Sequence, residues 1–172
     1  MARRTSLKSA PDEGSDAKAE ARTSNVIRKL PPFEQSIAAI LLSTKESVIA
    51  PMRPKLREFK ITEPQWRVMR VINDRGLTDA TGLAEVGLLH APSVTRILKE
   101  LEERGLIIRE TDANDRRRNL VALSPKGREV VKTISRQVLH VMREYGDRFG
   151  AQRLSDLLDE LRALSAAIKG VK

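Results

Sequence analysis

The sequence contains no cysteine among its 172 residues, which excludes disulfide bonds, thiolate nucleophiles, iron–sulfur clusters and the usual structural zinc sites. This absence agrees with a reducing compartment. The two histidines, His90 and His140, are too few and too far apart in the sequence to build a metal site. We therefore expect neither a metal nor a cofactor.

The chain also has no run of eighteen or more apolar residues, so no membrane-spanning helix and no membrane partner are expected. Its N-terminus is basic but lacks the apolar stretch and cleavage site of a secretory signal, which favours the cytoplasm. The length is sufficient for one domain with a sizeable core and short for two independent domains.

Aromatic residues are scarce: three Phe, one Trp and one Tyr. Lys and Arg number 32 against 23 Asp and Glu, a net charge of +9, so we expect a polyanionic partner. Charge alone does not choose among nucleic acid, an anionic membrane surface and an acidic protein. Proteins that bind single strands or RNA usually stack bases on aromatic side chains, so among nucleic acids the scarcity favours duplex DNA.

Signals of catalysis are missing as well, since the sequence has no glycine-rich phosphate loop, nucleophile elbow or metal-ligand spacing. Glu102 and Glu103 are neighbours on the exterior of a predicted helix. Asp112 and Asp115 fall in a predicted exposed loop, so neither carboxylate pair suits acid–base catalysis. We predict that the protein is not an enzyme.

The residues that are present predict a mainly α-helical fold with a small β-wing. Residues 1–30 have few large apolar side chains and a net charge of +3, so we expect a disordered basic tail. Further on, apolar residues recur at three- and four-residue steps, which predicts a helix over about 33–59 with a kink at Pro51 and Pro54. We assign residues 31–60 to an N-terminal dimerisation helix.

Residues 61–123 are expected to form a winged helix-turn-helix, whose first helix begins at a capping box of Thr62 and Gln65. The helices of this domain are expected over 62–76, 79–86 and 91–105. Two strands follow and enclose the polar tip of the wing, over 106–111 and 119–123.

Two amphipathic helices are expected over residues 124–172, the first capped by Ser124 and the second beginning after Gly150. Together with the first helix they carry more apolar surface than a small winged domain can cover. Unburied apolar stripes on terminal helices favour dimerisation, so we assign these residues to C-terminal dimerisation helices.

The polar face of the helix over 91–105 is the predicted DNA-reading surface. Serine and threonine can reach phosphates or base edges there, and arginine can pair bidentately with guanine in the major groove. The alternative is an amphipathic helix whose polar side is merely solvated. The predicted contacts on this helix are Pro92, Ser93, Thr95, Arg96 and Lys99.

Three consecutive arginines at the wing tip suit the narrow minor groove, whose negative potential attracts guanidinium groups. A neighbouring aspartate can orient one of them by a forked pair. A solvated charge run is the alternative, but a position just after a helix-turn-helix favours the DNA contact. The predicted wing contacts are Asp115, Arg116, Arg117 and Arg118.

The span from Leu56 to Gly127 resembles the MarR winged-helix regulators, through Ile61–Arg70, Pro92–Leu98, Leu101–Ile107, Asp115–Arg117 and Val121–Gly127. The segment around Trp66, with Arg53 before it, looks closest to the branch that controls homoprotocatechuate and related aromatic-acid catabolism. The resemblance implies a homodimer on a pseudo-palindromic operator. It also implies that the helix over 91–105 is the recognition helix and that Arg117 is the wing's minor-groove arginine.

By the same resemblance, a cleft between the dimerisation helices and the winged domain admits an aromatic carboxylate or its coenzyme A thioester. An aromatic surface beside cationic donors would suit such an effector. The alternatives are that Trp66 only packs in the core and that His90 is only a structural hydrogen-bonding residue. The predicted effector-binding residues are Arg53, Trp66, Arg70 and His90.

The sequence therefore predicts a homodimeric, sequence-specific repressor of transcription that is released by an aromatic effector and located with the bacterial nucleoid. One alternative is a chromatin protein that coats DNA without sequence preference. A winged helix used only for protein contacts is another. A specific regulator should bind its operator about a thousand times more tightly than other duplexes.

If Arg117 enters the minor groove in both subunits, Arg117→Ala should weaken operator binding strongly. It should also flatten the salt dependence by about one unit of log–log slope for each lost contact. Fluorescence anisotropy over a salt series measures both quantities, and circular dichroism should stay unchanged. An operator affinity within about twofold of wild type would mean that the arginine triplet is solvated charge.

Overall fold

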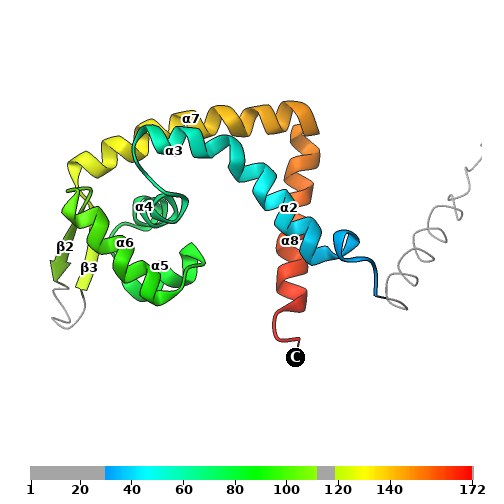
Figure 1. Ribbon diagram of the computed structural model, residues 1–172, viewed down its shortest axis with the longest axis horizontal. Coiled ribbons are helices and arrows are strands. Elements are labelled where there is room, and N and C mark those ends of the chain that lie inside the picture. The colour runs from blue at the N-terminus through cyan, green and yellow to red at the C-terminus, as the bar shows by residue number, and fades with distance from the viewer. Residues whose placement is uncertain (1–29, 112–118, 172) are drawn as a thin grey trace, which may run out of the picture. The chain divides into compact units, whose positions relative to one another are not determined.

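The computed structural model describes residues 30–111 and 119–171 (Figure 1). The chain divides into two compact units, residues 1–47 and 48–172. The described part of the first unit contains a 3-10 turn, η1 (Phe33–Gln35), and most of α2 (Ile37–Ile49). The Oγ of Ser36 accepts a hydrogen bond from the Ala39 N–H at 3.2 Å and so caps the start of α2.

The helix predicted over 33–59 is divided into segments. A 3-10 turn, η2 (Ala50–Met52), separates α2 from α3 (Arg53–Glu58). Proline lacks a backbone N–H and cannot continue the hydrogen-bond ladder, so Pro51 interrupts the helix where the sequence predicts a kink. The prediction was wrong at its N-terminal end, because the extended backbone of Ser36 ends η1 before α2 begins.

Helix α4 (Glu63–Arg75) begins and ends as the sequence predicts. The Oγ1 of Thr62 accepts from the Gln65 N–H at 3.3 Å, and the Oε1 of Gln65 accepts from the Thr62 N–H at 3.0 Å. These two bonds complete the capping box. The helix ends at Gly76, whose φ of +77° lies in the region that favours glycine.

The helix-turn-helix consists of α5 (Ala80–Gly87) and α6 (Ala91–Glu103). The Oδ1 of Asp79 accepts from the Gly82 N–H at 2.8 Å and caps α5. Leu88 ends α5 in the left-handed conformation at φ +51°, although it is not a glycine. The two predicted helices are therefore present and are joined by a short turn.

Three antiparallel strands form one small sheet in the order β1–β3–β2. The predicted hairpin is present as β2 (Ile107–Thr111) and β3 (Asn119–Leu123), which pair along their whole length. The third strand, β1 (Thr78–Asp79), was missed, because two residues are too few to show an alternating pattern. It pairs with the other side of β3 and extends the wing into a sheet.

Two helices complete the second unit, α7 (Pro125–Phe149) and α8 (Ala151–Ile168), which are separated by Gly150 at φ +95°. Ser124 caps α7, since its Oγ accepts from the Gly127 N–H at 2.9 Å. In the described ranges we find no helix with the length and hydropathy needed to cross a membrane.

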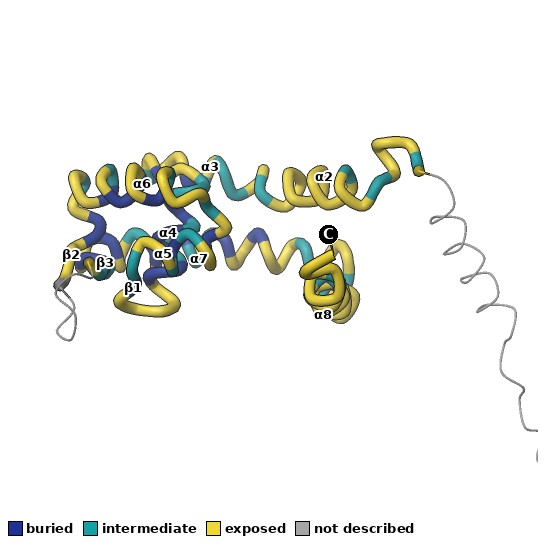
Figure 2. Tube along the Cα trace, turned by 90° about the horizontal axis from the view of Figure 1, so that it is seen from below, coloured by how far each residue is buried: buried dark blue, intermediate teal, exposed yellow. Residues whose placement is uncertain are grey.

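The hydrophobic core lies where α4, α6, the sheet and the N-terminal half of α7 meet (Figure 2). Val68 and Met69 of α4 and Leu101 of α6 are completely buried within it. By contrast, α2 and α8 contain no buried residue.

The helices and the one small sheet confirm the predicted fold class, mainly α-helical with a small β-wing.

Gly127, in the first turn of α7, approaches the chain so closely that a Cβ there would overlap the carbonyl oxygen of Leu106. Backbone is the obstacle, so Gly127→Ala should lower the free energy of unfolding by about 1–3 kcal/mol. Urea unfolding followed by circular dichroism measures this change.

Gly146 provides a matched control within the same helix, because the nearest atom to a Cβ there is 3.8 Å away. Alanine is the better helix former, so Gly146→Ala should be neutral or stabilise by about 0.5–1 kcal/mol. Equal destabilisation by the two substitutions would contradict the close approach at Gly127.

Candidate DNA interface

The buried face of α6 determines which of its side chains are available to a partner. Val94, Ile97, Leu98 and Leu101 are all buried. Their spacing of three and four residues is that of one helix face, so the side chains between them point outward. The side chains of Arg96 and Lys99 are 78% and 75% exposed.

The other predicted contacts on α6 lie near its start. Pro92 and Thr95 are exposed, and Ser93 is half-buried. The hydroxyl of Thr95 donates to the Ala91 carbonyl at 3.4 Å, a bond within the helix that a phosphate oxygen or base edge could replace. The structure therefore brings all five predicted residues of this helix onto its first two and a half turns.

The turn before α6 is held by a side chain that the sequence analysis missed. Arg67 of α4 donates from Nη1 to the carbonyls of Gly87 at 3.0 Å and Leu88 at 3.3 Å. A guanidinium has several donors in a rigid fork, so one side chain can satisfy two carbonyls. His90 follows this turn as the first residue before α6, and its side chain makes no capping bond.

The opposite end of α6 is tied to its neighbours by charged side chains. Arg104 donates to the carbonyls of Phe59 at 2.9 Å and Lys60 at 2.8 Å. Arg109 of β2 pairs with Glu102 of α6 at 2.8 Å between Nε and Oε2. These contacts fix the C-terminal end of α6 relative to the segment before α4 and to the wing.

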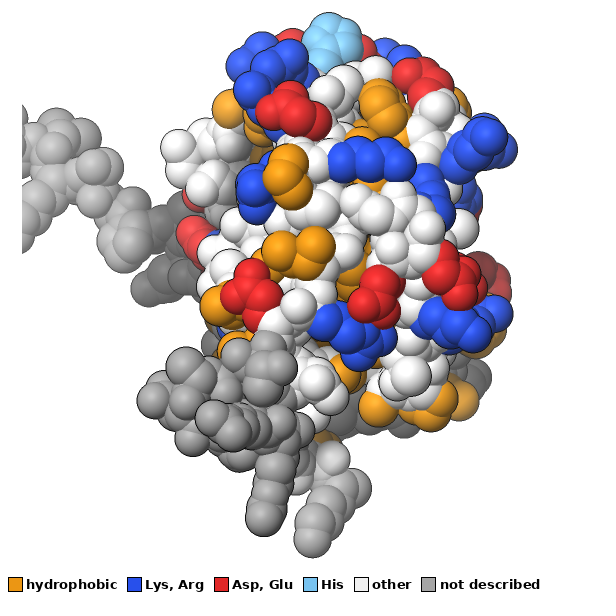
Figure 3. Space-filling model, turned by 90° about the vertical axis from the view of Figure 1, so that its left-hand side faces the viewer, with side chains coloured by type: hydrophobic (Ala, Val, Ile, Leu, Met, Phe, Trp, Pro, Cys, Tyr) orange, Lys and Arg blue, Asp and Glu red, His pale blue; other side chains and the backbone are white. Residues whose placement is uncertain are grey.

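The exposed surface around α6 carries charges of both signs. Arg96 lies 3.8 Å from Glu100, and Lys99 lies 3.9 Å from Glu103, each pair one helical turn apart. Figure 3 shows the end of the molecule where β2 and β3 lie, with Lys and Arg side chains interspersed with Asp and Glu. This face is therefore not a uniform basic patch, so the contact of each basic side chain with DNA has to be assigned separately.

The wing tip lies outside the described residues, so the predicted contacts Asp115, Arg116, Arg117 and Arg118 stay predictions. The strands that carry the tip are placed. Thr111 at the end of β2 is paired with Asn119 at the start of β3.

The four predicted effector residues fall into separate groups. Trp66 is 7% exposed in the core, and the Cζ of Arg70 lies 5.7 Å from the centroid of its ring. Arg53 lies 3.8 Å from Glu63. Glu63 in turn lies 3.8 Å from Arg67, which links α3 through the start of α4 to the turn before α6.

His90 lines a cavity of about 470 Å³ between α4 and α6. Arg67 and Arg96 line the same cavity, and neither Trp66, Arg70 nor Arg53 is part of its wall. The structure thus groups Trp66 with Arg70, and His90 with Arg67.

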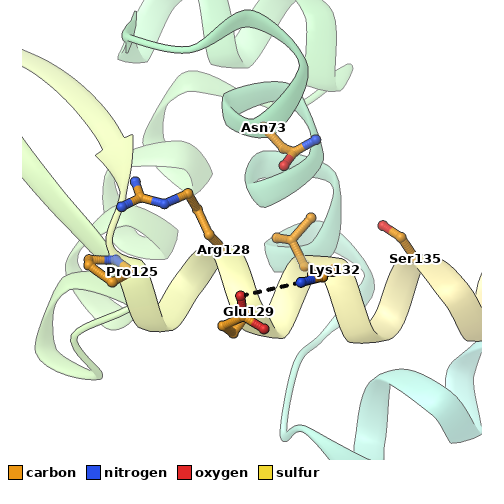
Figure 4. Close-up of a pocket in the computed structure, with 7 residues that line it drawn as sticks. Asn73, Pro125, Arg128, Glu129, Lys132 and Ser135 are labelled. Atoms are coloured by element: carbon orange, nitrogen blue, oxygen red, sulfur yellow. Dashed lines mark ion pairs between the residues drawn. The ribbon is translucent and has the colours of Figure 1, made fainter.

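A larger, open cavity of about 640 Å³ lies between the end of α4 and the start of α7 (Figure 4). Its wall includes Asn73, Arg128 and Lys132, but Arg128 donates to the Leu123 carbonyl at 2.7 Å and Lys132 lies 3.8 Å from Glu129. The cations are thus already partnered, and no predicted site residue lies in this wall.

Tyr145 joins α7 to the end of α2, since its hydroxyl donates to the Val48 carbonyl at 2.7 Å. Burial, and secondarily the negative charge of Glu144, raises the pKa of Tyr145 above its ordinary value. The hydroxyl therefore keeps its proton at neutral pH.

Among the described residues, no cluster of His, Asp and Glu could hold a metal ion.

Comparison with known proteins identifies relatives over most of the chain. A model of the MarR family matches residues 61–118. The HTH-type transcriptional regulator FarR of Neisseria gonorrhoeae is 32% identical over 136 residues, which cover 77% of this chain and 93% of that protein. The homoprotocatechuate degradative operon repressor of Escherichia coli is 30% identical over 135 residues, which cover 77% and 91%.

Among solved structures, NadR in complex with 4-hydroxyphenylacetate is similar with a TM-score of 0.71 and 28% identity, covering 84% of this chain and 99% of that one. FarR and the Escherichia coli repressor are transcriptional regulators, which confirms the prediction that the chain is not an enzyme. The matched residues 61–118 contain α4, α5, α6 and β2, so the family match coincides with the helix-turn-helix.

Arg96 and Lys99 provide a matched pair, since both are exposed cations on α6. Arg96→Ala should cost about 1–3 kcal/mol of binding to a duplex selected from random sequences and much less to a scrambled duplex. Lys99→Ala should weaken binding to both duplexes alike and reduce the salt slope by about one unit. Fluorescence anisotropy measures both affinities. If both substitutions weaken binding to the two duplexes by the same factor, α6 does not read bases.

Proposed function

The chain belongs to the MarR family of DNA-binding transcriptional regulators, and on that premise we propose that it acts as a homodimeric repressor. It recognises a pseudo-palindromic operator through α6 and the wing. A small aromatic carboxylate or its coenzyme A thioester releases it from that operator.

The observation that carries this proposal is the two-sided character of α6. Its apolar face is buried, its two ends are tied to neighbouring elements, and Thr95, Arg96 and Lys99 remain exposed between them. A helix held in this way can enter a major groove with its side chains already oriented, because it needs no support from the DNA. An arginine on such a face can discriminate guanine by a bidentate pair.

Dimerisation is supported by the apolar side chains that α2 and α8 leave exposed. Neither helix contains a buried residue, and each apolar area covered by a second copy would contribute about 25 cal/mol per Å². Two recognition helices about 34 Å apart would then meet successive major grooves. The exposed apolar residues of these helices include Ile37, Ile40, Leu41 and Leu42 in α2 and Leu157, Leu158 and Ile168 in α8.

The chemical class of the effector is supported by Trp66 and Arg70. Arg70 lies near the Trp66 ring, its Nε is buried without a partner among the described residues, and its Nη2 contacts Asp74 at 3.4 Å. An aromatic carboxylate could replace Asp74 at this guanidinium and lay its ring against the indole. The relative NadR binds 4-hydroxyphenylacetate, and the Escherichia coli relative represses an operon for homoprotocatechuate degradation.

Release of DNA follows from the burial of Trp66. Because only 7% of this residue is exposed, a ligand ring can reach the indole face only if the packing around α4 opens. The same helix carries Arg67, which holds the turn before α6. A ligand that prefers the opened arrangement by a few kcal/mol would therefore shift the population away from the DNA-binding state. Arg53 and His90 remain proposed effector residues. Arg53 contacts Glu63, which contacts Arg67, and His90 follows the turn that Arg67 holds.

Operator DNA provides the test. In a titration followed by fluorescence anisotropy, two chains should bind each selected duplex, about a thousand times more tightly than a scrambled duplex. A panel of phenylacetates, benzoates, cinnamates and their coenzyme A thioesters should contain at least one member that weakens operator binding about tenfold.

Arg70→Met should raise the concentration of that compound needed for release by about tenfold or more, because a charged hydrogen bond is lost. Arg75→Met is the matched control on α4 and should leave the response unchanged. Equal affinity for selected and scrambled duplexes would identify a DNA-coating protein instead. If no compound in the panel releases the operator, the proposed effector class is wrong.

A further inference from the structure

Glu100, in the middle of α6, lies between one buried and one exposed side chain. Gln65, which is 5% exposed, donates from Nε2 to Glu100 Oε2 at 2.8 Å. The second carboxylate oxygen, Oε1, lies 3.8 Å from the Nε of Arg96. The carboxylate is therefore held from the core side and directed toward the arginine on the DNA-reading face.

Gln65 is itself fixed, because its Oε1 accepts from the Thr62 N–H in the capping box at the start of α4. The Gln65 side chain thus makes two hydrogen bonds, one through its amide oxygen as acceptor and one through its amide NH2 group as donor. A glutamate at this position would complete the capping box equally well but would repel Glu100. Glutamine satisfies both the helix N-terminus and the carboxylate of α6.

The other acidic partner of a basic side chain on this face lacks such a support. Glu103 lies 3.9 Å from Lys99, and its side chain is 63% exposed. Ion pairs of this kind between exposed residues contribute little and restrain neither side chain strongly. Glu100 differs because one of its oxygens is bound to a buried amide.

A carboxylate on this surface opposes binding to a polyanion, since it lies where phosphates approach. Glu100 must therefore contribute to something other than affinity for DNA. A free arginine loses rotamer entropy when it pairs with a base, and an anchored carboxylate removes part of that cost in advance. On a duplex that offers the arginine no bidentate partner, the repulsion by Glu100 has no compensation.

We propose that Glu100 is a positioning residue that, anchored by Gln65, orients Arg96 for base recognition and raises specificity at the expense of affinity. The inference rests on the proposed function, in which α6 reads the operator. It adds a specificity-determining contact that begins in the capping box of α4. Arg96 is thereby oriented relative to α4 as well as to its own helix.

The test compares Glu100→Gln with Glu103→Gln, because each removes one negative charge from α6 and leaves an amide of the same size. Affinity for a selected operator and for a scrambled duplex is measured by fluorescence anisotropy, with a thermal melt for each variant. Glu103→Gln should raise both affinities by the same factor, so the ratio of the two stays at its wild-type value. Glu100→Gln should lower that ratio by about fivefold or more, since Arg96 loses its restraint.

The double variant Gln65→Glu with Glu100→Gln exchanges the two side chains at constant net charge. It preserves both the capping box and one hydrogen bond between the helices, so its melting temperature should match that of wild type. No carboxylate faces Arg96 from position 100 in this variant. The specificity ratio should therefore stay as low as in Glu100→Gln alone.

Three results would overturn the inference while leaving the proposed function intact. The first is a Glu100→Gln ratio within about twofold of wild type, and the second is an equal loss of ratio in Glu103→Gln. The third is a wild-type ratio in the exchanged double variant, which would mean that the bond between the helices suffices without the charge. A wild-type protein that binds both duplexes equally would overturn the proposed function and this inference together.

Discussion

Burial of one face of α6 is the interaction on which the rest of the DNA-binding unit depends. Each buried aliphatic side chain of that face contributes about 1.5–3 kcal/mol relative to exposure. Successive residues are rotated by about 100° around a helix axis, so a rotation by one position would bury Arg96 and expose Leu98. The apolar stripe therefore selects which side chains of α6 stay exposed to a partner.

The apolar stripe fixes the rotation of α6 but not its tilt or its position along its axis, because apolar contacts are not directional. Those are set by hydrogen bonds at the ends. Arg67 holds the turn before α6, and Arg104 binds the carbonyls of Phe59 and Lys60 beyond its C-terminus. In both places a guanidinium binds backbone carbonyls, which satisfies polar groups that a loop would otherwise leave to solvent.

The features that the sequence predicted well depend on residues close together in the chain. The capping box of Thr62 and Gln65 spans three residues, and the end of α4 depends on Gly76 alone. The contacts that hold α6 escaped prediction because they join residues far apart. Arg67 and Gly87 are separated by 20 residues, Gln65 and Glu100 by 35, and Arg104 and Lys60 by 44. No periodicity encodes such pairs.

The predicted effector residues illustrate the same limit. Family resemblance placed Trp66 and His90 in one cleft, whereas His90 lines a cavity with Arg67. Trp66 and Arg67 are consecutive, so their side chains leave α4 about 100° apart, and of the two only Arg67 lines that cavity. The resemblance suggested one shared site for Trp66 and His90, whereas the geometry of α4 directs Trp66 and Arg67 differently.

This separation is also what makes α4 suited to couple two events. Trp66 and Arg70 lie one turn apart on one side of the helix, while Gln65 and Arg67 project from other sides to α6 and to the turn before it. A close-packed interior transmits displacement instead of absorbing it, so a shift of α4 at Trp66 would move two of the side chains that hold α6. Under the proposed function, an effector at Trp66 and Arg70 would displace α6 without touching it, because two of the side chains that hold α6 belong to α4.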